Sequence, residues 1–295
     1  MKKSPVLIGI VVIGVIMVVF IGAMLLLTLM FRRETPTFAL GAKVGVVEIT
    51  GVISESKGII RQIKYFVEDG GVKAIVLRVD SPGGGVGASQ EIHQEVVKAR
   101  AVKPVVASFG GVAASGGYYV ACGADKIVAN PGTITGSIGV VMQFANLEEL
   151  FKKIGYKGYV IKSGPHKDIG SPFREMKPEE KELLQEVIDT VHRQFVRAVA
   201  EGRKVPVEQI MPIADGRIFT GEQAQAMGLV DELGNLQDTI DLAAQMGGIE
   251  GKPAVIYPPK RKPSLFDYLA EGIAQRLKEE VQETARPGLD YIWYQ

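Results

Sequence analysis

The sequence is poor in the residues that build disulfide frameworks and metal centres. It has one cysteine, Cys122, and three histidines among 295 residues. A single cysteine cannot form an intrachain disulfide, and His93, His166 and His192 show no spacing typical of a zinc site. We therefore expect no disulfide stapling and no bound metal.

An excess of charge of either sign is also absent. The 34 Lys and Arg residues nearly balance 33 Asp and Glu residues, and 46% of the chain is hydrophobic. Surfaces that bind nucleic acid normally add a basic excess, and disordered chains lack this much apolar content. These balances predict a folded protein with no nucleic-acid partner.

Both common nucleotide-binding glycine motifs are missing, namely Gly-x-x-x-x-Gly-Lys-Ser/Thr and a Gly-x-Gly-x-x-Gly that opens the first helix. Glycine itself is abundant, with 35 residues. It gathers in four predicted turns, at residues 81–85, 109–111, 115–117 and 132–139. Backbone N–H groups at such turns can face a developing oxyanion, so we expect catalytic loops and no cofactor.

One long run without charge is present near the N-terminus, at residues 6–30. At about 1.5 Å per residue it could cross a hydrocarbon core of ~30 Å. A cleaved signal peptide is the alternative, but its apolar region is normally ~7–15 residues and ends in small residues. The run predicts an uncleaved transmembrane anchor. Lys2 and Lys3 nearly balance Arg32 and Arg33, so charge hardly decides its orientation.

Apolar strands alternate with helices through the first half of the remaining chain. Strands are expected at residues 43–49, 74–79, 104–109 and 126–129, and helices at 54–68, 88–101 and 113–122. Strands without in/out alternation indicate an α/β fold with both sheet faces covered. The predicted organisation is an anchor at 1–33, a tether at 34–42, a domain at 43–250 and a linker with an amphipathic helix at 251–295.

The second half is more helical. Pro178 lies in the first turn of a long predicted helix with apolar positions at 3.6-residue spacing. Thr220 and Gln223 predict a capping box, and Gly228 predicts the end of the short helix that follows. Ser264 is the expected N-cap of a final helix.

Ser115 is a candidate nucleophile because it lies among small residues at the predicted start of a helix. The alternative is an ordinary N-cap serine. A nucleophile needs a base, and we expect His93 and His192 to be surface residues of amphipathic helices. The downstream cluster holds Lys162, His166 and Lys167, and residue chemistry alone does not choose among them.

Five motifs resemble those of one bacterial family. They are Asp80-Ser81-Pro82-Gly83-Gly84, Ala114-Ser115-Gly116-Gly117-Tyr118-Tyr119, Thr135-Gly136-Ser137-Ile138-Gly139, His166-Lys167-Asp168, and Ala214-Asp215-Gly216-Arg217 with Gly228-Leu229-Val230-Asp231 beyond it. The sequence resembles the signal peptide peptidase A family in its short, single-repeat form, from about residue 43 to 236. The resemblance implies the Clp/crotonase fold of repeated β-β-α units, following one N-terminal transmembrane helix.

The resemblance also implies site residues. Ser115 matches the nucleophile, Lys167 the general base, and Ser137 the residue that orients the lysine. Gly84 and Gly116 match the turns whose N–H groups form the oxyanion hole, with Gly83 an alternative to Gly84. A lysine acts as a base only when neutral, so its pKa must fall from about 10.4 towards 7–8.

By resemblance the function is a membrane-anchored serine endopeptidase that degrades cleaved signal peptides and similar membrane-released peptides. Its domain would lie outside the cytoplasm on the bacterial inner membrane. A single repeat implies a homo-oligomeric ring in which one subunit's Ser115 meets its neighbour's Lys167. A crotonase-like acyl-transfer enzyme and a non-catalytic membrane scaffold are the alternatives.

Overall fold

The computed structural model describes residues 14–22, 24, 42–259 and 290–292, and the chain divides into two units, residues 1–40 and 41–295. In the first unit, residues 14–22 and 24 are helical. Within the described ranges no helix is long and apolar enough to cross a membrane. The rest of the predicted anchor, nearly all of the tether and the helix expected from Ser264 lie outside the described residues, and the predicted domain boundaries stay predictions.

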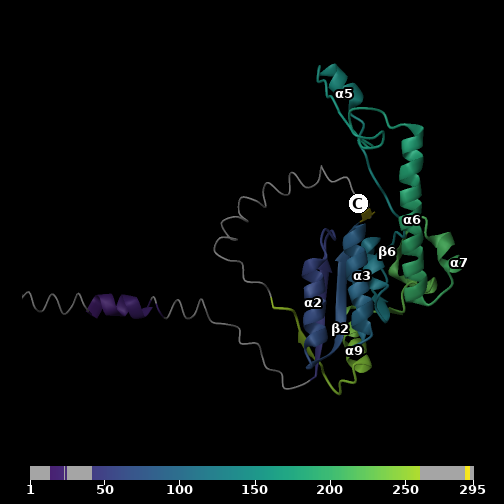
Figure 1. Cartoon of the computed structure of the whole chain (residues 1–295). Coiled ribbons are helices and arrows are strands. Elements are labelled where there is room, and N and C mark those ends of the chain that lie inside the picture. The colour runs from purple at the N-terminus through teal and green to yellow at the C-terminus, as the bar shows by residue number, and fades with distance from the viewer. Residues whose placement is uncertain (1–13, 23, 25–41, 260–289, 293–295) are drawn as a thin grey trace, which may run out of the picture. The chain divides into compact units, whose positions relative to one another are not determined.

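A mostly parallel sheet forms the centre of the second unit (Figure 1). Its eight described strands are β1 (Lys43–Thr50), β2 (Val72–Ser81), β4 (Val105–Ala114), β5 (Lys126–Ala129), β6 (Ile134–Gly136), β7 (Ile218–Thr220), β8 (Glu232–Leu233) and β9 (Ala254–Ile256). The main order is β7-β6-β4-β2-β1-β9, and β5 pairs with β4 and β8. Only β7 runs antiparallel to its neighbour among these described pairs. Two short strands, β3 (Gly83–Gly85) and β10 (Asp290–Ile292), pair separately.

Helices cover both faces of the sheet. They are α2 (Lys57–Glu68), α3 (Val86–Arg100), α4 (Gly116–Ala121), α5 (Glu148–Lys153), α6 (Pro178–Arg203), α7 (Val207–Ile210), α8 (Gly221–Ala226) and α9 (Leu236–Met246). One core includes Val47 and Leu77 with α2, α3, α4 and the end of α6. A second core packs Val46 and Val76 against α9. Because neighbouring positions of a strand feed opposite cores, the sheet is apolar on both sides, which confirms the predicted α/β class.

Most predicted elements are confirmed, including the Pro178 helix and the Thr220 capping box, in which Thr220 and Gln223 bond reciprocally. The turn predicted at residues 109–111 is wrong, because these residues continue β4. A Cβ on Gly110 would lie 2.6 Å from the Asp80 side chain, so this glycine allows close strand approach instead of a turn. The next helix consequently starts at Gly116, later than predicted.

The expectation for His93 is also wrong. This side chain is buried, and its ring packs edge-on against Tyr119 with centroids 5.0 Å apart. Helix α3 is covered by α4 as well as by the sheet, so its polar stripe is not wholly solvent-exposed. The Nε2 atom of His192 is likewise buried, without a hydrogen-bond partner in the described structure.

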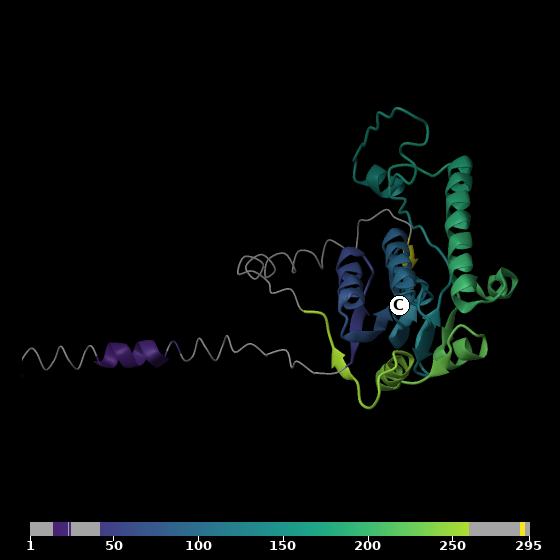
Figure 2. The ribbon, with the colours of Figure 1, turned by 60° about the horizontal axis from the view of Figure 1, so that its bottom comes forward.

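A segment we term the arm, residues 140–177, links β6 to α6 and carries α5. Both α5 and the first half of α6 stand clear of the sheet in the two views (Figures 1 and 2). No residue from 139 to 179 is buried. The arm therefore has no buried core, although the rings of Phe151, Tyr156 and Phe173 pack on one another.

Candidate active site

Ser115 lies where β4 ends and α4 begins. Its backbone has φ 52° and ψ −116°, a region that favours glycine, and its side chain is 1% exposed. The Ser115 N–H donates to the Gly136 carbonyl at 2.8 Å, while its hydroxyl makes no capping hydrogen bond to the helix. Ser115 therefore occupies the N-cap position of α4 without capping the helix, and a sharp strained turn holds its hydroxyl.

Ser137 occupies the equivalent position on the neighbouring strand. Ala114 of β4 pairs directly with Gly136 of β6, so the residues that follow them lie at the same end of parallel strands. Ser137 also has a positive φ, 50°, and is buried. The Ser137 N–H donates to the Arg217 carbonyl at 2.8 Å. The fold thus brings the two predicted serines together.

The geometry of β3 distinguishes Gly84 from Gly83. The Gly83 N–H donates to the Ser81 hydroxyl at 3.1 Å, so it is already satisfied. The Gly83 carbonyl accepts from Ile53 and the Gly85 N–H donates to Ile53, at 2.8 and 2.9 Å. Because backbone groups of successive strand residues face opposite edges, the Gly84 N–H and C=O point to the other edge. Gly84, and not Gly83, can offer an oxyanion donor there.

Close packing at this turn requires glycine at two positions. A Cβ on Gly84 would lie 2.3 Å from the Ile53 carbonyl oxygen, and one on Gly117 would lie 2.9 Å from the Ser81 carbonyl oxygen. The start of α4 therefore packs directly against the turn that leads into β3. Gly116 is the first residue of α4, where a helix leaves N–H groups without an acceptor in the preceding turn. Its N–H is a second candidate oxyanion donor.

The chain's own β10 lies on the edge that Gly84 faces. The two strands are antiparallel, with Tyr291 opposite Gly84 and Ile292 opposite Gly83. β10 also approaches α3 and α4. This edge therefore accepts an extended peptide segment by backbone pairing.

Lys167 lies apart from this group, on the part of the arm between α5 and α6. It is exposed, and in the described structure no hydrogen bond or ion pair joins its ammonium to Ser115 or to any other residue. His166 is exposed beside it, whereas Lys162 is paired with Asp168 at 2.5 Å. One subunit thus brings Ser115, Ser137, Gly84 and Gly116 together, but not Lys167.

Sequence reasoning missed two residues that hold the site. Ser81 fixes the Gly83 N–H, and Ile53 pairs with the inner edge of β3. The role of Ser81 could have been predicted from the sequence, because serine hydroxyls often accept a hydrogen bond from the backbone N–H two residues later. The role of Ile53 depends on a contact between distant segments and had no local signal.

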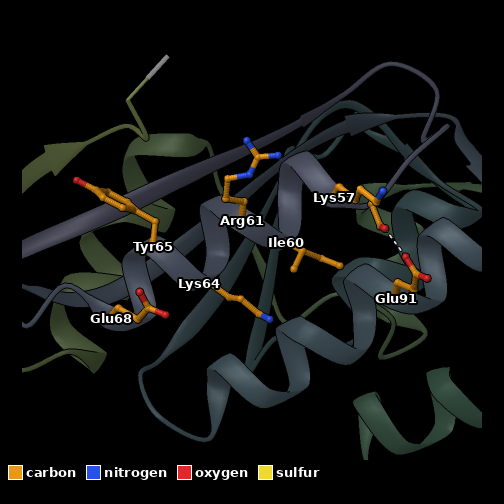
Figure 3. Close-up of a pocket in the computed structure, with 8 residues that line it drawn as sticks. Lys57, Ile60, Arg61, Lys64, Tyr65, Glu68 and Glu91 are labelled. Atoms are coloured by element: carbon orange, nitrogen blue, oxygen red, sulfur yellow. Dashed lines mark hydrogen bonds between the residues drawn. The ribbon is translucent and has the colours of Figure 1, made fainter. Parts of the chain in front are cut away.

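A pocket of about 630 Å³ lies on α2, facing α3 (Figure 3). Lys57, Arg61 and Lys64 share it with Glu68 and Glu91. The hydroxyl of Ser56 donates to the Glu91 carboxylate, as the dashed line indicates. No candidate catalytic residue lines this pocket, so it is separate from the Ser115 site.

The matching family models cover the elements that carry these residues. The model for peptidase family S49 matches residues 98–250, which include Ser115, Ser137 and Lys167. The model for Clp protease matches residues 43–133, in agreement with the Clp/crotonase type of sheet.

Individual proteins match over longer stretches. A candidate protease of Methanocaldococcus jannaschii is 37% identical over 297 residues, covering 95% of each chain. A candidate protease of Synechocystis is 48% identical over 210 residues, which is 70% of this chain and 76% of the other. A candidate signal peptide peptidase SppA of Enterococcus faecium is 41% identical over 181 residues, covering 61% of this chain and 53% of that protein.

Proposed function

Because this chain belongs to peptidase family S49, a family of serine proteases, we propose that it is an endopeptidase that uses Ser115 and Lys167 as a catalytic dyad. One observation carries the proposal. A strained, buried serine lies in the turn that packs against β3, and an extended segment pairs with the edge that Gly84 faces. A substrate peptide that took the place of β10 would run past Ser115.

The chemistry follows from these positions. Neutral Lys167 takes the proton of the Ser115 hydroxyl, and the oxygen attacks the peptide carbonyl. The Gly84 and Gly116 N–H groups stabilise the oxyanion, because they are fixed before charge develops. The amine leaves with a proton returned by the lysine, and water then hydrolyses the acyl-enzyme. Ser137 orients the lysine.

The lysine would come from a neighbouring subunit in a homo-oligomeric ring. The arm, which includes Lys167, stands clear of the sheet (Figures 1 and 2), and it carries exposed apolar side chains. These are Ile154, Tyr156, Tyr159, Val160 and Ile161. Such a surface suits burial against another subunit, and the buried Ser115 site supplies the apolar surroundings that keep a lysine neutral.

The proposed substrates are signal-peptide remnants and other membrane-released peptides. This rests on the resemblance in sequence and on the name of the Enterococcus faecium relative. The uncharged run at residues 6–30 would anchor the chain in the bacterial inner membrane, with the peptidase domain outside the cytoplasm. An anchored enzyme meets such peptides where they are released.

The two other candidate functions are less well supported. A crotonase-like enzyme shares the oxyanion-hole fold, but it needs neither an anchor nor a Ser/Lys pair. The strand edge that pairs with β10 also suits a peptide substrate better than an acyl thioester, because it binds through backbone hydrogen bonds. A non-catalytic scaffold gives no reason for strained backbone at both Ser115 and Ser137.

The test compares alanine variants of the full chain in hydrolysis of a fluorogenic peptide and in labelling by a fluorophosphonate. Ser115→Ala and Lys167→Ala should each lose turnover by about 10³-fold or more, and Ser137→Ala should lose less. Lys252→Ala, which removes an exposed lysine outside the arm, should keep wild-type turnover. Chelators should have little effect.

Two results would contradict the proposal. Near-wild-type turnover in Ser115→Ala or Lys167→Ala, with an unchanged thermal melt, would eliminate the dyad. Fluorophosphonate labelling that persists in Ser115→Ala would place the reactive serine elsewhere.

A further inference from the structure

A cluster of charged side chains lies beside Lys167, near the point where the arm joins α6. Its members are Lys162, Asp168, Arg174 and Glu180. Asp168, the residue after Lys167, accepts hydrogen bonds from Arg174 Nε at 3.1 Å and from Arg174 Nη2 at 2.8 Å. Lys162 Nζ donates to the same carboxylate at 2.5 Å and to the Pro165 carbonyl at 2.9 Å. Arg174 Nη2 also lies 3.3 Å from the Asp168 carbonyl oxygen. Arg174 therefore binds both the side chain and the backbone carbonyl of Asp168, the residue next to Lys167.

The same guanidinium is attached to α6 through Glu180. Arg174 Nη1 and Nη2 donate to the two Glu180 carboxylate oxygens at 2.7 and 2.6 Å. Glu180 is 1% exposed and also accepts from the Lys177 N–H at 3.0 Å, as part of the capping box of α6. A buried carboxylate in the first turn of a 26-residue helix is a rigid attachment point. Hydrogen bonds from Arg174 lower the pKa of Asp168 and of Glu180, so both stay ionised.

This cluster matters because apolar contacts hold the loop only weakly. Phe173 stacks on Phe151 and Tyr156, with ring centroids 4.8 and 5.8 Å apart, but none of the three rings is buried. No residue from 139 to 179 is buried, so the hydrophobic effect contributes little to the conformation around Lys167. A bidentate guanidinium between two carboxylates supplies directional contacts in its place.

The cluster also leaves Lys167 unpaired. Asp168 is the carboxylate nearest to Lys167 in sequence, and it is occupied by Arg174 and Lys162. Among the described residues Lys167 forms no ion pair. An adjacent free carboxylate would favour a charged ammonium, which cannot accept a proton.

We infer that Arg174 is a positioning residue, which fixes the loop that carries Lys167 by bridging Asp168 to the buried Glu180. The inference rests on the proposed role of Lys167 as the base. Arg174 does not touch the reacting atoms, and it acts through Asp168.

The test is a double-mutant cycle on the full chain, with Asp168→Asn, Arg174→Met and the double variant. Asp168→Asn keeps the bridge from Arg174 to Glu180 but removes the charge of the residue-168 side chain and one of its two acceptor oxygens, so it weakens the contact to the loop while preserving the fold. Each single variant should lower kcat by roughly 10- to 100-fold, since small misplacement of a catalytic group has costs of this size, with KM within about twofold. The double variant should be no slower than the slower single variant, because both changes break the same contact.

Lys98→Met is the matched control. The exposed Lys98 forms an ion pair with the partly buried Glu95 on α3, 3.5 Å apart, and its loss should leave kcat unchanged. Thermal melts and oligomer size are measured for every variant, and Asp168→Asn should match the wild type in both.

The outcomes separate the two proposals. If Lys167→Ala keeps its activity in the same assay, the dyad itself fails. If Lys167→Ala is inactive while Asp168→Asn keeps wild-type kcat, the dyad stands and the positioning role of Arg174 is overturned. Losses that multiply in the double variant, or that appear in KM instead of kcat, would also overturn it.

Discussion

Three non-glycine residues in the described structure have a positive φ, and two of them are Ser115 and Ser137. The third, Lys204, ends α6 in the common left-handed conformation. Such backbone conformations cost of order 1–3 kcal/mol and persist where the surrounding structure enforces them. Ser115 and Ser137 both have this strained backbone, and they lie at the same end of two paired strands. This pairing distinguishes the candidate active site from an ordinary sheet edge.

Strain at Ser115 predicts an unusual order of stability between two inactive variants. Ser115→Gly should be more stable than Ser115→Ala by about 1 kcal/mol, because only glycine adopts this φ and ψ without strain. In an unstrained position glycine would be the less stable, by ~0.4–1 kcal/mol. Chemical denaturation of both proteins measures the difference, and an alanine variant at least as stable as the glycine variant would rule out strain.

Gly84 and Gly85 provide a matched pair of substitutions. A Cβ on Gly84 would lie 2.3 Å from the Ile53 carbonyl oxygen, whereas one on Gly85 would lie 3.7 Å from it. Gly84→Ala should displace β3 and its N–H, with a loss in kcat of about 10²-fold or more. Gly85→Ala should retain most of its activity. Equal activity of the two variants would mean that the Gly84 N–H does not serve the reaction.

Burial of His93 predicts a pH-dependent stability. Burial, with a smaller effect of Arg100, lowers the pKa of His93 from 6.5 to about 4. Between these values the unfolded chain binds the proton more readily, so this contribution is complete above pH 6.5 and falls as the pH drops towards 4. His93→Phe keeps the aromatic contact with Tyr119 and removes the titration. From pH 7.5 to 4.5 the wild type should lose roughly 2 to 3 kcal/mol more than the variant in urea unfolding, and parallel losses would contradict this.

At this scale the sequence could identify residue types but not bond directions. The motifs predicted Ser115, Ser137 and the glycine pair, yet the choice of Gly84 over Gly83 depends on which N–H the Ser81 hydroxyl occupies. His93 was misjudged because periodicity marks one apolar stripe and cannot show that a second helix covers the other side.

Elements were predictable where their signals are local. The β-branched runs of β1 and β5 and the capping box of α8 lie within a few residues of their expected positions. The length of β4 was not predictable, because Gly110 looks like a turn residue in the sequence. In the structure it leaves room for the Asp80 side chain of the neighbouring strand. The pairing of β10 with β3 joins segments about 200 residues apart, and no local pattern predicts such a contact.

This pairing leads to a prediction about regulation by the C-terminal segment. If β10 occupies the edge that a substrate would use, it competes with peptides, so weakening it should lower KM by about 10-fold without lowering kcat. Tyr291→Pro removes the N–H opposite Gly84 and should have this effect. Gln295→Pro, beyond the strand, is the control. An unchanged KM in Tyr291→Pro would mean that β10 does not compete with substrate.

On the scale of the whole molecule, the arm is the feature that a single subunit does not explain. Its side chains bury no core, and apolar residues such as Tyr159, 87% exposed, remain in solvent. The buried half of the site stays with the sheet, and the exposed Lys167 stays with the arm. A closed ring of identical subunits would bury the exposed apolar side chains of the arm and would bring Lys167 to a neighbour's Ser115. In such a ring each subunit contributes one arm and contacts the arm of a neighbour.

Mixing two inactive variants tests this arrangement. Ser115→Ala chains keep Lys167, and Lys167→Ala chains keep Ser115, so neither alone should hydrolyse peptide. If each site takes its serine and lysine from different subunits, random assembly of equal amounts restores an intact pair at roughly one site in four, and about a quarter of wild-type activity returns. If both residues come from one chain, every site lacks one partner and no activity returns. Crosslinking first establishes that the two variants share oligomers. Zero recovery from such mixed oligomers would eliminate the shared site, while the losses in the separate variants would still support the Ser-Lys chemistry.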